Sequence, residues 1–67
     1  MRKATNVKKD KQWYRDAVEG CLIVQGIPKK EAKLLIRRYG LKERLNLYTN
    51  EQLHYPIEAT VKEILSM

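Results

Sequence analysis

The sequence has too few cysteine and histidine residues for a disulfide or a zinc site. Among its 67 residues there is one cysteine, Cys21, and one histidine, His54. No internal disulfide can form, and these two residues cannot supply the four ligands of a structural zinc site. A chain of this length makes one domain close to the lower size limit for a stable core. Its stability must therefore come from side-chain packing.

Long apolar runs and a secretory signal are also lacking. The longest apolar run covers residues 21–24, far short of the roughly 18 residues that indicate a membrane-spanning helix. The basic amino terminus leads into further charged residues instead of the apolar segment of a signal peptide. We therefore expect a soluble, cytoplasmic protein that does not enter a membrane.

Patterns typical of enzymes are missing as well. The sequence contains no paired acid and base at catalytic spacing, no glycine-rich phosphate loop and no nucleophile next to a base. Cys21 is expected to be a small core residue, and His54 a hydrogen-bonding residue or a phosphate contact. The sequence thus predicts a non-enzymatic protein without a cofactor or a metal site.

Positive charge is abundant and lies in two blocks. The net charge is +6; residues 1–15 contain six basic residues against one acidic, and residues 29–44 contain seven against two. The two segments 16–28 and 45–67 are each net negative. Positive charge that is concentrated in two blocks favours a polyanion such as DNA as the partner, although many small proteins are equally basic without binding nucleic acid. An acidic protein is the alternative partner, and a homodimer is compatible with the composition.

The clearest element is a helix that begins at Pro28 and ends at Gly40, because proline is tolerated in a first turn and glycine often closes a helix. Its residues divide into an apolar stripe and a basic stripe, with Leu34 well off the apolar arc. The apolar stripe consists of Ala32, Leu35, Ile36 and Tyr39, and the basic stripe of Lys29, Lys30, Lys33 and Arg37.

Residues 1–9 hold too little apolar surface to offset the entropy of ordering, so they are expected to form a flexible basic arm. A helix should follow over residues 10–25, with Asp10 as its N-cap. In this helix Trp13 is expected to anchor the core, with exposed stacking as the alternative. Gly20 is expected to mark the close approach of a neighbouring helix.

In the second half of the chain, the spacing of the apolar residues predicts a short helix over residues 41–48 and a closing helix over residues 56–66. Leu41, Leu45 and Tyr48 should face inward. Between the two helices, Thr49 and Gln52 fit a capping box that begins a helical turn, but residues 45–56 also fit a β-hairpin. The expected fold of residues 10–67 is a compact all-α bundle of three to four helices, with a winged helical domain as the alternative.

Two sets of spacings in this sequence are shared with known families. The first set is Gly26-x-Pro28, Ala32-Lys33-x-x-Ile36-Arg37, Tyr48-x-Asn50-x-x-Leu53 and Pro56-x-x-Ala59-x-Val61-x-x-Ile64-Leu65. Through it, residues 26–65 resemble small excisionase-like DNA-binding proteins of mobile genetic elements. That resemblance implies a second helix in the major groove and backbone contacts near residues 46–52. The second set lies in residues 25–32, and through it residues 17–36 resemble the ubiquitin-associated type of three-helix domain, which binds proteins.

The sequence therefore favours a small DNA-binding accessory or regulatory protein of a phage or mobile element. A helical protein-interaction module, an adaptor or inhibitor with Leu34 as an exposed contact, is the alternative. Base readout is expected from Lys30, Lys33 and Arg37, since these residue types pair with guanine edges. The expected phosphate contacts are Lys8, Lys9, Lys29, Lys30, Lys33, Arg37 and Arg38.

Overall fold

The computed structural model describes the backbone of residues 3–67 and the side chains of residues 9–67. This part of the chain forms five helices joined by short turns. None of them combines the length and apolar character needed to cross a membrane. The helices are α1 (Lys3–Val24), α2 (Lys29–Tyr39), α3 (Leu41–Leu47), α4 (Thr49–His54) and α5 (Ile57–Leu65).

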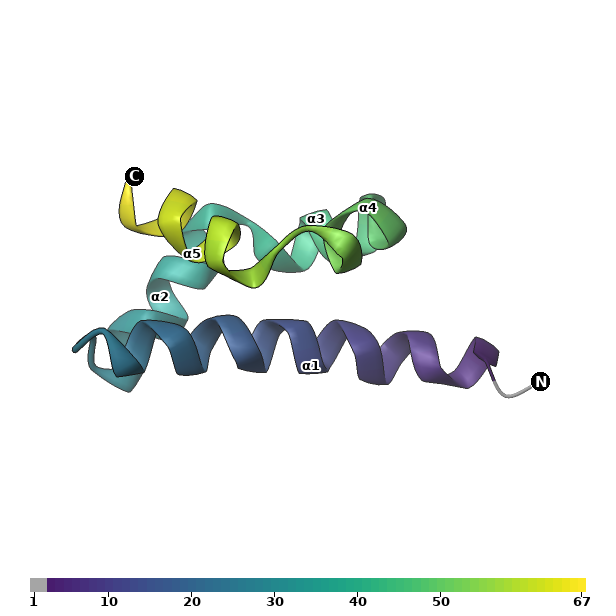
Figure 1. The fold of residues 1–67 in the computed structure, drawn as a ribbon, viewed down its shortest axis with the longest axis horizontal. Coiled ribbons are helices and arrows are strands. Elements are labelled where there is room, and N and C mark those ends of the chain that lie inside the picture. Colours follow the sequence, from purple (N-terminus) through teal and green to yellow (C-terminus); the bar gives the residue numbers. More distant parts are fainter. Residues whose placement is uncertain (1–2) are drawn as a thin grey trace.

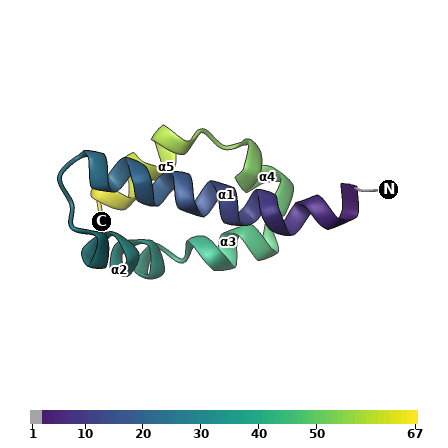
Figure 2. The same cartoon turned by 90° about the horizontal axis from the view of Figure 1, so that it is seen from below.

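The molecule consists of one long helix and two rows of short helices that cover one side of it. α1 runs the length of the molecule, and its first turns extend past α3 and α4 (Figure 1). Seen along the perpendicular direction, α2 and α3 form one row and α4 and α5 return as the other, with α1 between the two rows (Figure 2). α1 contacts all four short helices. The expected all-α class is confirmed, but residues 3–67 form five helices instead of the expected three to four, because α4 is a helix of its own.

Two glycines and a proline create the turns between these segments. Gly26 and Gly40 have φ values of +98° and +80°, in the left-handed region that other residues rarely adopt. Gly40 ends α2, and its N–H donates to the carbonyls of Ile36 and Arg37, as expected for a C-cap. Pro56 precedes α5 in the same way that Pro28 precedes α2. The boundaries predicted from these residues are confirmed.

The amino-terminal segment differs from the expectation. α1 begins at Lys3, so residues 3–9 belong to the helix and Asp10 lies inside it and is not its N-cap. Lysine and alanine have good helix propensity, and no proline or glycine interrupts this segment. The expected arm, residues 1–9, is therefore continuous with α1 from Lys3 onward, whereas residues 1 and 2 lie outside the described part.

The hairpin alternative for residues 45–56 is not supported, because these residues form the end of α3 and the whole of α4, and no strand occurs in residues 3–67. The capping box is also absent. The Thr49 hydroxyl donates to the carbonyl of Leu45 at 2.7 Å, which lies back in α3. Gln52 turns into the core instead of reaching the start of its own helix. Tyr48, expected to face inward, is exposed.

The core contains residues from α1, α2, α3 and α5, but its large aromatic residue is not the expected one. Tyr14 is 1% exposed, whereas Trp13 is 61% exposed on the outer side of α1. Neighbours in a helix point about 100° apart, so only one of the two can lie at the centre of the buried face. The buried apolar residues are Tyr14, Val18, Leu22, Ala32, Ile36, Leu41, Leu45, Val61 and Ile64.

Gly20 is also placed differently from the expectation. A Cβ atom added at Gly20 would meet no atom within 4 Å, so no neighbouring helix approaches this position. Gly20 lies on the outer side of α1, as Trp13 does. Nothing within the described residues accounts for a glycine there.

A small polar network is buried in the apolar core. The Tyr14 hydroxyl donates to the carbonyl oxygen of Tyr55 at 2.8 Å and lies 2.7 Å from the Thr60 hydroxyl. The Gln52 amide donates to the Tyr14 hydroxyl at 3.2 Å. Among the described side chains, no buried nitrogen or oxygen lacks a partner. The network therefore fixes α1 against α4 and α5 without leaving a polar group unsatisfied.

We predict that Tyr14→Phe lowers the free energy of unfolding by about 1–3 kcal/mol, because Gln52 and Thr60 stay buried after losing a shared partner. Tyr48→Phe removes a hydroxyl from an exposed ring and should change stability by less than about 0.5 kcal/mol. Urea unfolding followed by circular dichroism measures both values. Equal stability of Tyr14→Phe and the wild type would contradict the role given to the network.

Candidate nucleic-acid interface

A basic trough runs between α1 and the row formed by α2 and α3. We define it by four cationic side chains, Lys11 and Arg15 from α1, Arg37 from α2 and Lys42 from α3. Two adjoining hollows of about 390 and 420 Å³ share Arg15 and Lys42 and together form the trough. The other lining residues are Gln12, Leu45 and Asn46 in the first hollow and Ile36 and Glu43 in the second.

The fold positions these cations through their buried neighbours. Lys11 and Arg15 are four residues apart and therefore share one flank of α1, beside the buried Tyr14. Arg37 follows Ile36, which is in the core. Lys42 follows Leu41, which is fully buried directly after the Gly40 turn. Each cation is thus either adjacent in sequence to a buried residue or one helical turn away from one, and packing holds that residue in place.

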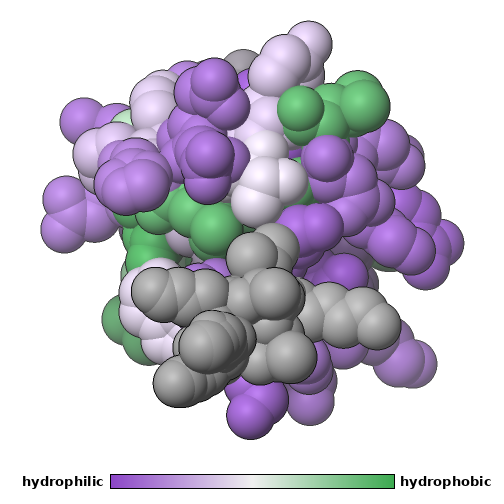
Figure 3. Space-filling view, turned by 90° about the vertical axis from the view of Figure 1, so that its right-hand side faces the viewer, coloured by the Kyte–Doolittle hydropathy of each residue, from purple (hydrophilic) through white to green (hydrophobic). Residues whose placement is uncertain are grey.

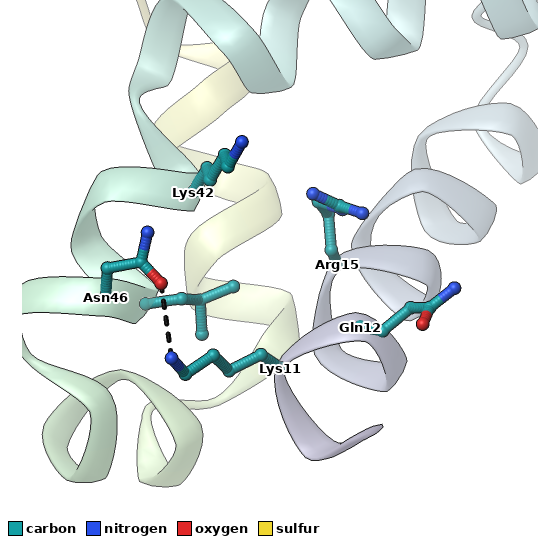
Figure 4. Close-up of a pocket in the computed structure, with 6 residues that line it drawn as sticks. Lys11, Gln12, Arg15, Lys42 and Asn46 are labelled. Carbon is teal, nitrogen blue, oxygen red and sulfur yellow. Dashed lines mark hydrogen bonds between the residues drawn. The ribbon is translucent and has the colours of Figure 1, made fainter. Parts of the chain in front are cut away.

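Figure 4 shows how the polar groups of the first hollow are directed. Lys42 and Arg15 extend from opposite walls into the space between the helices. The Lys11 ammonium donates to Asn46 Oδ1 at 3.2 Å across the mouth of the hollow. The residues lining this hollow include no carboxylate. In the adjoining hollow, which shares Arg15 and Lys42, Glu43 is the one carboxylate among the described lining residues. Cations therefore outnumber carboxylates by four to one in the trough, which makes an anion the favoured ligand.

Farther along the same side of α1, the basic stripe of α2 faces acidic residues. The Lys33 ammonium lies 3.8 Å from a Glu19 carboxylate oxygen. Lys29 and Lys33 line a third hollow together with Asp16 and Glu19. This half of the interhelical groove is therefore electrostatically mixed, whereas the half defined by the basic trough is cationic.

The seven expected phosphate contacts do not form one cluster. Arg37 lies in the basic trough, and Lys29 and Lys33 lie in the mixed half of the groove. Lys9 is exposed on α1, and the side chain of Lys8 falls outside the described residues. The two remaining residues, Lys30 and Arg38, are exposed on α2 and do not line the trough.

Sequence reasoning missed Lys11, Arg15 and Lys42 as members of one site. The i, i+4 spacing of Lys11 and Arg15 was visible, but it predicts a common helix flank and does not identify the helix facing it. Lys42 lies in a different helix, and only the bend at Gly40 directs it toward α1. The juxtaposition is a tertiary property.

The single histidine and the single cysteine do not line the basic trough. His54 Nδ1 lies 2.8 Å from the carbonyl oxygen of Asn50, one turn earlier in α4, and donates to it. Cys21 is half-buried beside the core. Within residues 9–67, no three histidine, cysteine or carboxylate side chains are grouped so that they could hold a metal ion.

A second polar cluster joins the two rows of short helices. The hydroxyls of Tyr39 and Tyr55 both donate to the Glu63 carboxylate, and the Arg44 guanidinium lies 4.4 Å from the centre of the Tyr39 ring. The hydrogen bond from Tyr39, followed by that from Tyr55, lowers the pKa of Glu63. Burial and the hydrogen bond to Glu63 raise the pKa of Tyr39 to about 12. The cluster thus connects α2 to α5 and to the turn before it.

We predict that Glu63→Gln destabilises the protein at neutral pH and has less effect in acid. The folded state holds the pKa of Glu63 below its ordinary value of 4.5. The carboxylate therefore contributes fully above that pH, and its contribution is lost as the pH falls through the folded-state pKa. Thermal unfolding of both proteins at pH 7 and pH 3 measures the difference.

At high pH we predict that the protein loses the stabilisation contributed by the Tyr39 hydroxyl. Because its folded-state pKa is raised from 10.0 to about 12, the stabilisation by the neutral phenol is complete below pH 10 and lost as the pH rises toward 12. Tyr39→Phe is the matched variant, and its effect should be non-additive with that of Glu63→Gln in a double-mutant cycle.

For the Glu63→Gln variant, an effect on stability that stays constant from pH 3 to pH 7 would contradict the role given to the cluster.

Figure 3 shows the end of the molecule at which α1 begins. The surface visible there is mostly hydrophilic, with apolar side chains in separate patches.

No family model matches the chain, and no curated protein or solved structure is significantly similar to it.

Proposed function

We propose that this protein is a small non-enzymatic accessory protein that binds nucleic acid and that the basic trough contacts the phosphates. The observation that carries the proposal is the convergence of four cations from three helices around two adjoining hollows, with Glu43 as the one acidic residue among the described lining. The cations are Lys11, Arg15, Arg37 and Lys42. A polyanion is the ligand that best offsets such a cluster.

The charge of the whole chain supports the same partner. With a net charge of +6, the protein attracts a polyanion at long range. The acidic residues Asp16 and Glu19 lie beside Lys29 and Lys33, which leaves the trough as the more positive half of the groove. A phosphate backbone would therefore be drawn to the trough in preference to the rest of this groove.

The trough suggests phosphate contacts different from those expected from sequence. An α2 helix that enters a major groove would present Lys33 and Arg37 outward. In the structure both residues lie on the flank of α2 that adjoins α1, and Lys33 pairs with Glu19. We therefore propose binding between the two helices and not along the outer surface of α2.

We predict that replacing Arg15 and Lys42 together with alanine weakens nucleic-acid binding and flattens its salt dependence. Each lost phosphate contact should reduce the slope of log K against log salt by about 0.7 for a single strand or about 0.9 for a duplex. Fluorescence anisotropy with a labelled oligonucleotide, in both forms and across a salt series, measures this slope.

The matched control is the double substitution Arg38→Ala with Lys62→Ala, which removes the same two residue types from outside the trough. It should lower affinity less and leave the fold intact, since both residues are exposed. Equal losses from the two double variants would show that only net charge matters. No binding by the wild type at about 50 mM salt would reject the proposal.

A second candidate function, a protein-interaction module, is favoured by the outer side of α1. Trp13 is exposed there, and the exposed Ile23 lies at the edge of this side, where it also lines the third hollow. Gly20 between them has no atom within 4 Å of an added Cβ, which leaves open space beside the helix. Exposed tryptophan is frequent in protein interfaces. Leu34 is 54% exposed on α2, as the sequence predicted. A second copy of the chain is the simplest partner for the outer side of α1.

We predict that, if this side of α1 mediates self-association, Trp13→Ala weakens the association by about tenfold or more, because a buried interface tryptophan often contributes about 2 kcal/mol. Leu34→Ala is the control on another helix. Sedimentation equilibrium over a concentration series measures the association. A monomer at all concentrations would remove a second copy as the partner.

A further inference from the structure

We infer that the basic trough accepts single-stranded nucleic acid in preference to a duplex. This inference rests on the proposed function and specifies the form of its ligand. It follows from three features of the described residues, which are the placement of cations on both walls, the outer faces of the flanking helices, and the groups between the walls.

The two walls of the trough are both cationic. Lys11 and Arg15 come from α1, and Arg37 and Lys42 come from the opposite row. A single strand can enter a groove of this kind, so that cations contact its backbone from both sides. In a duplex each backbone is flanked by the paired bases, which restrict how far it can enter between two helices.

The outer surfaces of the helices that flank the trough carry fewer cations than the trough itself. Helices that enter the major groove direct long polar side chains at base edges. The outer surface of α2 has two such side chains, Lys30 and Arg38, but the exposed Leu34 lies between them, one turn from each. On α1 the outer side carries the exposed Trp13. The four cations of the trough therefore form the larger basic surface, and they lie between the helices instead of on an outer helix face.

The space between the walls is suited to an unpaired nucleotide. Ile36 and Leu45 supply apolar surface at the bottom of the two hollows, and Gln12 and Asn46 supply amides. An ammonium group can only donate, so the contact with Lys11 occupies the Asn46 oxygen and leaves its NH₂ group to donate to a ligand. An acceptor on the Watson–Crick edge of a base fits this group, and that edge is accessible only when the base is unpaired.

The experiment compares one labelled 12-nucleotide sequence as a single strand and as a duplex, by fluorescence anisotropy across a salt series. We expect the single strand to bind about tenfold more tightly, equivalent to about 1.4 kcal/mol. Four phosphate contacts would give a slope of log K against log salt near −3, at about −0.7 per contact. A duplex that binds as tightly as the single strand would overturn the inference.

Asn46→Ala tests the amide separately from the charges. It should weaken single-strand binding by about threefold or more and leave duplex binding unchanged, because it removes one hydrogen-bond donor. Asn50→Ala, at an exposed position in α4 outside the trough, is the matched control. Equal effects of Asn46→Ala on the two forms would contradict the use of the amide on an unpaired base.

Trp13 reports whether bases bind elsewhere. It is about 160° around α1 from Arg15, so a strand in the trough does not reach its ring. Trp13 is the only tryptophan, and we expect its fluorescence to stay constant as the single strand saturates the protein. Strong quenching would place the bases on Trp13 and overturn the trough as their site.

The outcomes separate the inference from the proposed function. If duplex binding equals single-strand binding and both weaken in the Arg15→Ala, Lys42→Ala variant, the inference fails and the proposed function stands. If neither form binds at about 50 mM salt, both fail. Tighter single-strand binding that depends on Arg15, Lys42 and Asn46 supports both.

Discussion

The position of α1 in the molecule depends on the buried hydroxyl of Tyr14. Its partners come from α4, from α5 and from the turn between them, where Gln52, Thr60 and the carbonyl of Tyr55 converge on one oxygen. Apolar packing alone tolerates small sliding of a helix, whereas a hydrogen-bonded group in the core has few acceptable positions. Lys11 and Arg15 lie on either side of Tyr14 in the sequence, so the same contact sets where the cations of α1 face the opposite row.

The fold was predictable where local rules apply. Pro28, Gly40 and Pro56 mark helix boundaries through backbone geometry, and the structure places the boundaries beside them. The start of α1 was missed because the entropy argument for a flexible arm outweighed the good helix propensity of residues 3–9. Trp13 and Tyr14 were exchanged because both fit a broad apolar face. Only the partners of the Tyr14 hydroxyl, distant in sequence, distinguish them.

The candidate site was less predictable, since it depends on which charges meet. The basic stripe of α2 is visible in the sequence, but Glu19, which pairs with Lys33, lies on another helix. Arg37 belongs to the same stripe and faces Arg15 and Lys42 instead. The basic stripe of α2 therefore contains one residue that pairs with a carboxylate, Lys33, and one that lies among other cations, Arg37. The packing of α2 against α1 determines this difference.

The long separation between Tyr14 and its partners also bears on biosynthesis. Thr60 follows Tyr14 by 46 residues, and at about 5–20 residues per second a ribosome needs roughly 2–9 s to add them. During that interval α1 has been made, but α4 and α5, which cover one side of its apolar face, have not. Val18 and Leu22, fully buried in the finished molecule, are then without part of their cover. The core therefore closes only after α5 has been synthesised.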